Sequence, residues 1–148
     1  MAAIVFLVLV LAAASSGALF KPGTWYEGLR KPAWTPPKWA FPVVWSMLYV
    51  MIGYAGWLVW TQLGWSLPMA LWGLQLVANA LWSYFFFGQR RMDLALVDVA
   101  ILWLAIAAFI LTTWTVVPVA ALLFLPYLLW VSAAAGLNHS VRRLNPEA

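Results

Sequence analysis

Residues 92–114 read MDLALVDVAILWLAIAAFILTTW, an apolar run whose length decides the fold class of this chain. A helix that crosses the hydrocarbon core of a bilayer needs about 20 consecutive, mostly apolar residues. Asp98 interrupts the run, and a carboxylate at such a depth costs roughly 2 to 3 kcal/mol. The run therefore predicts a membrane-spanning helix with one residue that needs a structural or functional reason.

Four further apolar runs lie on either side of this one, at residues 2–20, 42–62, 67–87 and 118–139. Each is near the length that a bilayer demands, and none alternates apolar and polar residues as the strands of a membrane barrel do. No long flexible or charged linker separates the runs, so a single domain is expected over residues 1–148. The sequence predicts an all-α membrane protein, built as a bundle of five transmembrane helices.

The composition agrees with a protein whose solvent is lipid. Of the 148 residues, 66% are hydrophobic and 8% are charged, and the mean hydropathy is +0.92. A water-soluble domain of this size would expose large apolar patches. Cysteine is absent and the only histidine is His139, so we expect no disulfide and no metal site. Paired carboxylates in one pocket, a Ser/His/Asp arrangement and a phosphate-binding loop are also missing, so no conventional catalytic residues are expected.

The positive charges predict which ends of the helices face the cytoplasm. All eight lysines and arginines follow the first, third or fifth run: Lys21, Arg30, Lys31, Lys38, Arg90, Arg91, Arg142 and Arg143. Basic residues gather on the cytoplasmic side of membrane proteins, so the first loop and the C-terminus are predicted to be cytoplasmic. Because the charges are scattered over helix ends rather than gathered on one polar face, nucleic acid is excluded as a partner.

The first run has a second interpretation as a signal peptide. Its end, AAASSGA at residues 12–18, is typical of a cleavage region. A signal peptide begins with a basic segment, however, and the first basic residue here is Lys21. Cleavage would also place residues 21–38 on the side opposite to the other basic ends. We therefore expect a retained transmembrane helix.

The longest connection, residues 21–41, is rich in proline and tryptophan, namely Pro22, Pro32, Pro36, Pro37, Trp25, Trp34 and Trp39. Proline removes a backbone donor and clashes with the preceding turn, so these residues forbid a continuous helix. Long ordered loops commonly have a function. We expect an ordered lid, packed over the cytoplasmic end of the bundle by its own aromatic rings.

One face of the third run combines amides with aromatic rings. Its members recur at helical spacing: Trp72, Gln75, Asn79, Trp82 and Phe86. An amide in hydrocarbon is costly unless it is hydrogen-bonded, so this face should turn toward protein or a cavity. Hydrogen bonds to neighbouring helices and contact with a ligand both fit the pattern.

The fourth run is predicted to point the face that carries its inner carboxylate into the bundle: Leu94, Asp98, Ile101, Ala105, Ala108 and Thr112. The other side is predicted to contact lipid: Val99, Trp103, Ile106 and Ile110. Asp98 is either a ligand contact or a packing residue that is protonated, hydrogen-bonded or paired with Arg90 or Arg91.

The second and fifth runs alternate aromatic and small side chains along one face: Trp45, Tyr49, Ile52 and Gly56, then Tyr127, Trp130, Ala134, Leu137 and Asn138. Rings with small residues between them leave a slot for a flat hydrophobic molecule, which a few amides would orient. The small residues also suit close packing between helices.

Several short motifs run along the chain. The most specific is KPAWTPPKW at residues 31–39, and others are WSMLY at 45–49, FFG at 86–88 and LPY at 125–127. Together with Gln75 and the other polar residues of the runs, these motifs resemble the TspO, or tryptophan-rich sensory, family. The similarity covers nearly the whole chain.

The resemblance implies a homodimeric five-helix bundle in the bacterial inner membrane, with a pocket beneath the first loop. Relatives bind porphyrins, haem, sterols and benzodiazepine-type drugs, so porphyrin or haem is the expected ligand and no cofactor is required. The sterol-recognition pattern needs a basic residue soon after Tyr127, which is missing. Carried over by position, the ligand-binding residues would be Trp34, Trp39, Trp45, Tyr49, Asn79, Trp82, Leu94, Asp98, Trp130, Ala134 and Leu137.

Three functions remain open on the sequence. The preferred hypothesis is binding of tetrapyrroles, in their transport or in the regulation of their synthesis. The second is light-dependent degradation of bound protoporphyrin, with the electron-rich indoles of Trp45 and Trp130 taking part. The third is a membrane partner protein without a ligand, in which Asp98 and the small residues serve helix association.

Overall fold

The computed structural model describes residues 2–19, 28–35 and 39–145. These residues form α1 (Ala2–Leu19), α3 (Ala40–Leu63), α4 (Leu67–Ser83), a π-helical turn η1 (Tyr84–Gly88), α5 (Met92–Thr113) and α6 (Pro118–Leu144). A helix lies at each of the five predicted positions, and no strand occurs in the described ranges. The prediction of an all-helical bundle is confirmed.

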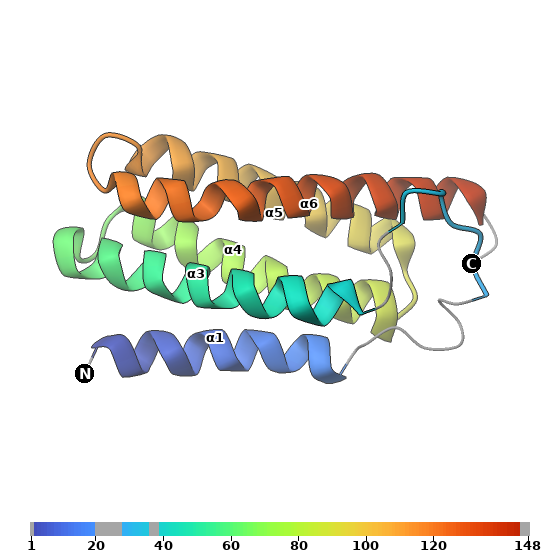
Figure 1. The fold of residues 1–148 in the computed structure, drawn as a ribbon, viewed down its shortest axis with the longest axis horizontal. Coiled ribbons are helices and arrows are strands. Elements are labelled where there is room, and N and C mark those ends of the chain that lie inside the picture. Colours follow the sequence, from blue (N-terminus) through green and yellow to red (C-terminus); the bar gives the residue numbers. More distant parts are fainter. Residues whose placement is uncertain (1, 20–27, 36–38, 146–148) are drawn as a thin grey trace.

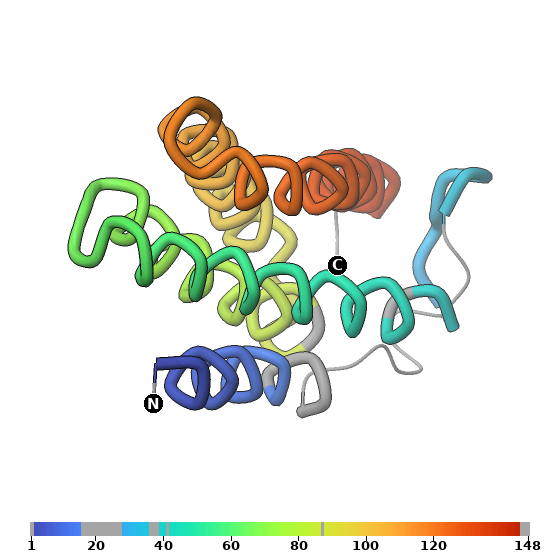
Figure 2. The backbone as a smooth tube through the Cα atoms, turned by 60° about the vertical axis from the view of Figure 1, so that its left-hand side comes forward, coloured from blue at the N-terminus to red at the C-terminus, as the bar shows by residue number. Residues whose placement is uncertain are grey.

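The five helices lie side by side with their long axes roughly aligned (Figure 1). Helix α1 packs against α3 and α4, α5 packs against α4 and α6, and α6 packs against α3. The neighbours therefore form a closed ring in the order α1, α3, α6, α5 and α4, which can be followed in Figure 2. Side chains from α3, α4 and α6 that point inward meet inside this ring.

The two ends of the bundle differ in charge. The start of α1 and the connections from α3 to α4 and from α5 to α6 lie at one end, while residues 28–35, the connection from α4 to α5 and the end of α6 lie at the other (Figure 1). The second end carries the described basic residues Arg30, Lys31, Arg90, Arg91, Arg142 and Arg143. Lys21 and Lys38 lie outside the described residues. The predicted separation of charge is present among the six basic residues that the structure describes.

Local sequence explains where two of the helices begin. The Ser66 hydroxyl caps α4 by accepting a hydrogen bond from the Met69 N–H at 3.4 Å, and Pro68 fills the first turn, where a proline costs no hydrogen bond. Gly64 precedes this cap with a φ of 60°, a left-handed conformation that glycine adopts without strain. Pro118 starts α6 in the same way as Pro68 starts α4.

Two helix ends differ from the prediction. The third helix was expected to run to residue 87, but its α-helical part ends at Ser83 and continues as the π-helical turn η1. Arg90 then adopts a φ of 56°, which turns the chain sharply into α5. The fifth helix was expected to end at residue 139, but it continues to Leu144. Arg142 and Arg143 lie in its last turn, where positive charges interact favourably with the helix dipole.

The described part of the chain contains three helices that are long and apolar enough to cross a membrane: Pro42–Leu63, Met92–Thr113 and Pro118–Leu144. The described apolar stretch of α1, Ala2–Ser15, is shorter. Helix α4 has 17 residues, and η1 extends it by 5. Three of the five predicted spans are thus supported by length and composition.

The buried face of α5 is only partly the predicted one, since Asp98 and Ala105 are buried as predicted but other positions are not. Val99, Ile106 and Ile110 were expected to contact lipid, but they are buried in the core. Leu94 and Ile101 were expected to point inward, but they are 37% and 46% exposed. The prediction was wrong because it centred the inward face on the carboxylate of this helix, which lies at the edge of the buried face rather than in its middle.

Trp103 also departs from the expectation of a purely lipid-facing side chain. It is 37% exposed, but its indole N–H donates a hydrogen bond to the Ser132 hydroxyl of α6 at 2.9 Å. The Ser132 hydroxyl in turn donates to the Leu128 carbonyl oxygen at 2.7 Å. Trp103 therefore joins α5 to α6 on the outside of the bundle.

Candidate ligand-binding site

A chain of hydrogen bonds joins α3, α4 and α6 inside the bundle. The Tyr49 hydroxyl donates to Asn79 Oδ1 at 2.7 Å, and Asn79 Nδ2 donates to the Tyr127 hydroxyl oxygen at 2.7 Å. The Tyr127 hydroxyl then donates to Gln75 Oε1 at 2.8 Å. Gln75 and Tyr127 are fully buried and Asn79 is 3% exposed. The two amides of the third run face neighbouring helices, as one of the two predicted alternatives requires.

Three aromatic rings gather around that of Trp45 at one side of this chain. The Trp45 ring stacks on Tyr49 with a centroid distance of 5.7 Å and an interplanar angle of 29°. Its edge-on contacts to Tyr127 and to Trp130 both have centroid distances of 6.3 Å. Trp45 and Tyr49 come from α3, whereas Tyr127 and Trp130 come from α6. Helices α3 and α6 thus bring together aromatic side chains that the sequence predicted to share inward faces of the second and fifth runs.

The hydrogen-bond chain continues to a close contact between α3 and α4. Gln75 Nε2 donates to the Trp72 carbonyl oxygen at 2.7 Å, and the Trp72 indole N–H donates to the Ile52 carbonyl oxygen at 2.9 Å. The Trp72 ring lies directly on Gly56, where a Cβ atom would lie 2.4 Å from Trp72 Cε2. Gly56 therefore serves close packing, which was one of the two predicted uses of the small residues.

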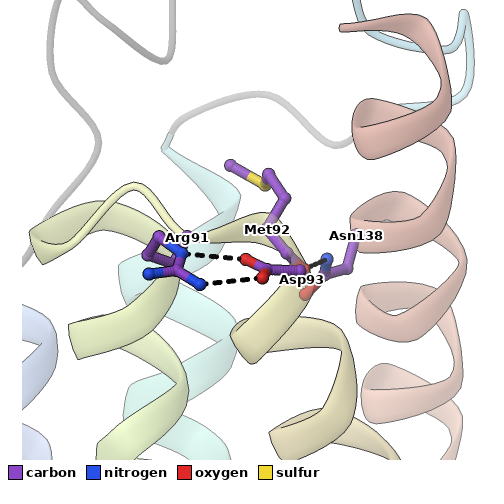
Figure 3. A network of polar contacts seen from close by, with 4 residues as sticks. All are labelled: Arg91, Met92, Asp93 and Asn138. Carbon is purple, nitrogen blue, oxygen red and sulfur yellow. Dashed lines mark hydrogen bonds and ion pairs between the residues drawn. The ribbon is translucent and has the colours of Figure 1, made fainter. Parts of the chain in front are cut away.

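A second polar cluster lies nearer to the basic end of the bundle. The Trp82 indole N–H donates to Asn138 Oδ1 at 3.1 Å, and Asn138 Nδ2 donates to the Met92 carbonyl oxygen at 3.0 Å (Figure 3). Asn138 is fully buried. One amide thereby fastens α4, α5 and α6 together at the level where α5 begins.

An ion pair lies beside this cluster. Arg91 forms two hydrogen bonds with Asp93, at 3.0 and 2.9 Å (Figure 3). The hydrogen bond to Asp93, together with the charge of this carboxylate, raises the pKa of the Arg91 guanidinium above its usual value. The two side chains are about half exposed, so the pair is screened by solvent and adds little to stability.

Asp98 is buried, with 7% of its surface exposed. Its Oδ2 atom has no hydrogen-bond partner within the described ranges. The predicted alternative of a pair with Arg91 is not observed, because Arg91 binds Asp93 instead. The Asp98 carboxylate therefore offers an acceptor without a partner at the edge of the core.

The structure brings together some of the predicted site residues and leaves others apart. Four meet directly in the hydrogen-bond chain or around the indole of the second run: Trp45, Tyr49, Asn79 and Trp130. Four more are buried: Trp82, Asp98, Ala134 and Leu137. The remaining three are exposed, at 52%, 70% and 37% of their surfaces: Trp34, Trp39 and Leu94.

A groove of about 610 Å³ lies between α1 and α3, next to the aromatic cluster. Its walls are formed by Ala3, Phe6, Leu7, Val10, Leu11 and Ala14 of α1 and by Ser46, Tyr49, Val50, Gly53, Tyr54 and Trp57 of α3. Tyr49 belongs both to this groove and to the hydrogen-bond chain. No site residue was predicted on α1, because its run is apolar all round and gives no sign of which face turns inward.

Sequence reasoning also placed Gln75 and Tyr127 on inward faces without including them among the ligand-binding residues. In the structure they form the centre of the hydrogen-bond chain. The available signal in the sequence was an amide on the same helix face as Asn79 and a hydroxyl on the same helix face as Trp130.

Comparison with known proteins agrees with this architecture. The TspO/MBR family model matches residues 3–144. The chain is 44% identical to the tryptophan-rich sensory protein of Cereibacter sphaeroides, over 97% of this chain and 92% of that protein. It is 40% identical to Protein CrtK of Rhodobacter capsulatus, over 96% and 91% of the two chains. It is 42% identical to the human translocator protein, over 82% and 75% of the two chains. The chain belongs to the TspO/MBR family of membrane proteins.

Proposed function

We propose that this protein binds porphyrins and similar flat, hydrophobic molecules at the aromatic cluster of α3 and α6, in their transport or in the regulation of tetrapyrrole synthesis. The observation that supports the proposal best is the meeting of four rings, those of Trp45, Tyr49, Tyr127 and Trp130, beside a chain of buried amides and hydroxyls. The names translocator and sensory protein, carried by two relatives, fit either role.

The chemistry of a tetrapyrrole suits this cluster. Its extended π-system would stack against indole and phenol rings, and each such contact is worth about 0.5 to 1.5 kcal/mol beyond the area it buries. The free Oδ2 acceptor of Asp98 would suit a pyrrole N–H. Trp34 and Trp39 of the first loop would cover the ligand at the basic end, where Arg142 and Arg143 would attract its carboxylates.

We also infer that all five helices cross the membrane. Helix α4 has 17 residues, and η1 extends it by 5. Helix α1 has 18 residues. Both lengths are near the roughly 20 residues that a bilayer requires. The basic end would face the cytoplasm of a bacterial cell. The protein would form homodimers in the inner membrane, as the family resemblance implies.

Cysteine labelling tests this topology, since the natural chain has no cysteine. In right-side-out membrane vesicles, a membrane-impermeant maleimide is expected to label Thr115→Cys, which lies between α5 and α6. Arg143→Cys, near the end of α6, is expected to react only after the vesicles are permeabilised. Labelling of both positions from the same side would show that α6 does not cross the membrane.

Tryptophan fluorescence tests porphyrin binding. Titration of the purified protein with protoporphyrin should quench its fluorescence in a saturable way, with a Kd in the micromolar range or below. Trp45→Phe, Trp130→Phe and Asn79→Ala are each expected to weaken binding by about five- to tenfold, which corresponds to the loss of one aromatic or polar contact. Trp103→Phe is the matched control, because Trp103 lies on the outer side of α5 and bonds to Ser132. Unchanged affinity in the three cluster variants would exclude this site.

The contact between the Trp45 and Trp130 rings supports a second candidate, the light-dependent degradation of bound porphyrin. Two adjacent electron-rich indoles would be placed to donate an electron to the excited ligand, and dissolved dioxygen would serve as the oxidant that the degradation requires. This activity predicts a new absorbing product that requires both light and intact protein. Equal loss of porphyrin in protein-free micelles under the same light would exclude it and leave binding untouched.

A further inference from the structure

The groove between α1 and α3 follows both helices over a defined length. It extends from Ala3 to Ala14 on α1 and from Trp57 to Ser46 on α3, because the two helices lie side by side and run in opposite directions (Figure 1). Its length is about 16 Å at a rise of 1.5 Å per residue. One leaflet contributes about 15 Å to the hydrocarbon core of a bilayer. The groove therefore matches the length of the acyl chains in one leaflet.

The floor of the groove is apolar and rigid. Phe6 and Val10 of α1 are 7% and 6% exposed, and the Phe6 ring packs edge-on against Trp72 with a centroid distance of 4.9 Å. Gly53 of α3 lets the two helices approach, since a Cβ atom there would lie 3.3 Å from Val10 Cγ2. The groove is thus formed before any molecule enters it, which lowers the cost of binding.

The polar groups of the groove are either bonded to the protein or placed at one end. The Ser46 hydroxyl donates to a carbonyl oxygen of its own helix at 2.6 Å, and the Tyr49 hydroxyl donates to Asn79 Oδ1 at 2.7 Å. Tyr54 and Trp57, whose ring centroids are 5.9 Å apart, lie at the end near the start of α1. Aromatic rings with a polar tip are enriched where acyl chains meet lipid headgroups. This end therefore suits a headgroup, and the rest of the groove suits hydrocarbon.

The rim of the groove is open to the surroundings of the bundle. Leu7, Leu11 and Val50 line it and are 58%, 58% and 74% exposed. In a membrane protein, apolar side chains on the outside of the bundle face acyl chains rather than water. An empty apolar groove would forfeit the dispersion contacts of its walls, and it offers too few polar partners to hold ordered water.

The dimensions of the groove indicate what fills it. A volume of about 610 Å³ spread over roughly 16 Å of helix leaves a mean cross-section of about 40 Å². A helix with its side chains is about 10 to 12 Å wide and has a cross-section of about 80 to 110 Å², so a second helix is too wide to enter. Carbon atoms pack about 3.5 to 4.0 Å apart, so one hydrocarbon chain needs roughly 12 to 16 Å². The groove has room for the two chains of a phospholipid.

We propose that this groove is a binding site for one membrane phospholipid, with its acyl chains along the floor of the groove and its headgroup at the end formed by Tyr54 and Trp57. The site is distinct from the aromatic cluster, since Tyr49 is the only member of that cluster that lines the groove. The proposal rests on the proposed crossing of the membrane by α1, and it does not depend on porphyrin binding.

Native mass spectrometry of the protein purified in mild detergent tests the site. One phospholipid per chain is expected to stay bound after washing that removes loosely held lipids. Ala14→Phe and Val50→Trp each place a large side chain in the groove and are expected to lower the bound fraction by about fivefold or more. Leu104→Trp is the matched control, because Leu104 is 63% exposed on the outer side of α5, and this variant should keep the lipid.

Quenching by a brominated lipid tests the position of the chains, and it decides the question whether or not the variants with a filled groove fold. Phosphatidylcholine with bromine atoms on its acyl chains, added to the delipidated natural protein, should quench tryptophan fluorescence to saturation at about one lipid per chain. Trp57→Phe should remove most of this saturable quenching, whereas Trp103→Phe on α5 should leave it unchanged. Quenching that only rises in proportion to the lipid in the micelle would overturn the site.

Three further results would overturn the proposal. They are unchanged lipid retention in folded Ala14→Phe and Val50→Trp, retention of a different class of molecule in place of the phospholipid, and disulfide formation between two chains through Leu7→Cys, which would mean that a second copy covers the groove. The topology of α1 is tested separately, since Ala2→Cys should react with a membrane-impermeant maleimide in right-side-out vesicles. If it reacts only after permeabilisation, the proposed crossing of α1 is wrong, while lipid retention still decides whether the groove binds a phospholipid.

Discussion

Replacement of Asn79 by leucine is expected to lower the free energy of unfolding by about 2 to 3 kcal/mol. The change removes two hydrogen bonds between helices, and such bonds contribute about 0.6 kcal/mol on average and up to about 1.7 kcal/mol in membrane proteins. It also leaves the Tyr49 hydroxyl without its acceptor and the Tyr127 oxygen without its donor, and a buried polar group that loses its partner costs about 1 to 3 kcal/mol. Reversible denaturation in mild detergent measures the difference.

A double-mutant cycle shows whether the loss comes from the hydrogen-bond chain itself. Tyr49→Phe removes one hydroxyl of the chain and keeps the ring that stacks on Trp45, so about 1 kcal/mol is expected. The double variant Tyr49→Phe with Asn79→Leu should cost less than the sum of the two single changes, because both remove the same bond. Additive losses would show that the bond between Tyr49 and Asn79 does not contribute to the stability of the bundle.

The positions of the helices could be predicted from the sequence because a bilayer sets their length. Each predicted run begins within two residues of the observed helix. The ends were less predictable, since α6 continues past residue 139 into a polar turn that an apolar run does not mark. The π-helical turn η1 was not predicted either, because it depends on backbone bonds such as that from the Gln89 N–H to the Tyr84 carbonyl oxygen rather than on a residue pattern.

The inward faces were predictable where polar and aromatic residues shared a stripe. The stripe of the third run is buried over its whole length, from Trp72 to Phe86. The same reasoning failed on α5, where a single carboxylate was taken as the centre of the inward face. An isolated polar residue shows only that it avoids lipid, and a position at the edge of a buried face satisfies this requirement as well as one in the middle.

Contacts between distant parts of the chain were outside the reach of sequence patterns. The pairing of Asn145 with Arg30 joins the end of the last helix to the first loop. No periodic pattern connects the two positions. A polar residue such as Asn145 is common after a helix and does not indicate a distant partner. Of the predicted lid, residues 21–41, the structure describes residues 28–35 and 39–41. Trp25, Pro36 and Pro37, which were expected to take part in it, lie outside the described residues.

The second large effect is expected at Gly56, where α3 receives the ring of Trp72 from α4. A Cβ atom at this position would lie 2.4, 2.5 and 2.8 Å from Trp72 Cε2, Nε1 and Cζ2. The ring cannot move aside easily, because Trp72 is only 3% exposed and its indole N–H donates to the Ile52 carbonyl oxygen. The ring also packs edge-on against Phe6, with a centroid distance of 4.9 Å. Even the smallest side chain must therefore displace a rigid, hydrogen-bonded group.

Gly56→Ala is expected to lower the free energy of unfolding by about 1 to 3 kcal/mol, the usual cost of overpacking a core, and by more if the bond from Trp72 to Ile52 breaks. Gly73→Ala is the matched control, since a Cβ atom there meets nothing within 4 Å. Alanine in a helix is favoured over glycine by about 0.8 to 1.0 kcal/mol, so this control should be neutral or stabilising. Denaturation of both variants in the same detergent measures the contrast. Equal stability would mean that α3 and α4 can separate at Gly56 without loss, which is incompatible with a tightly packed ring of five helices.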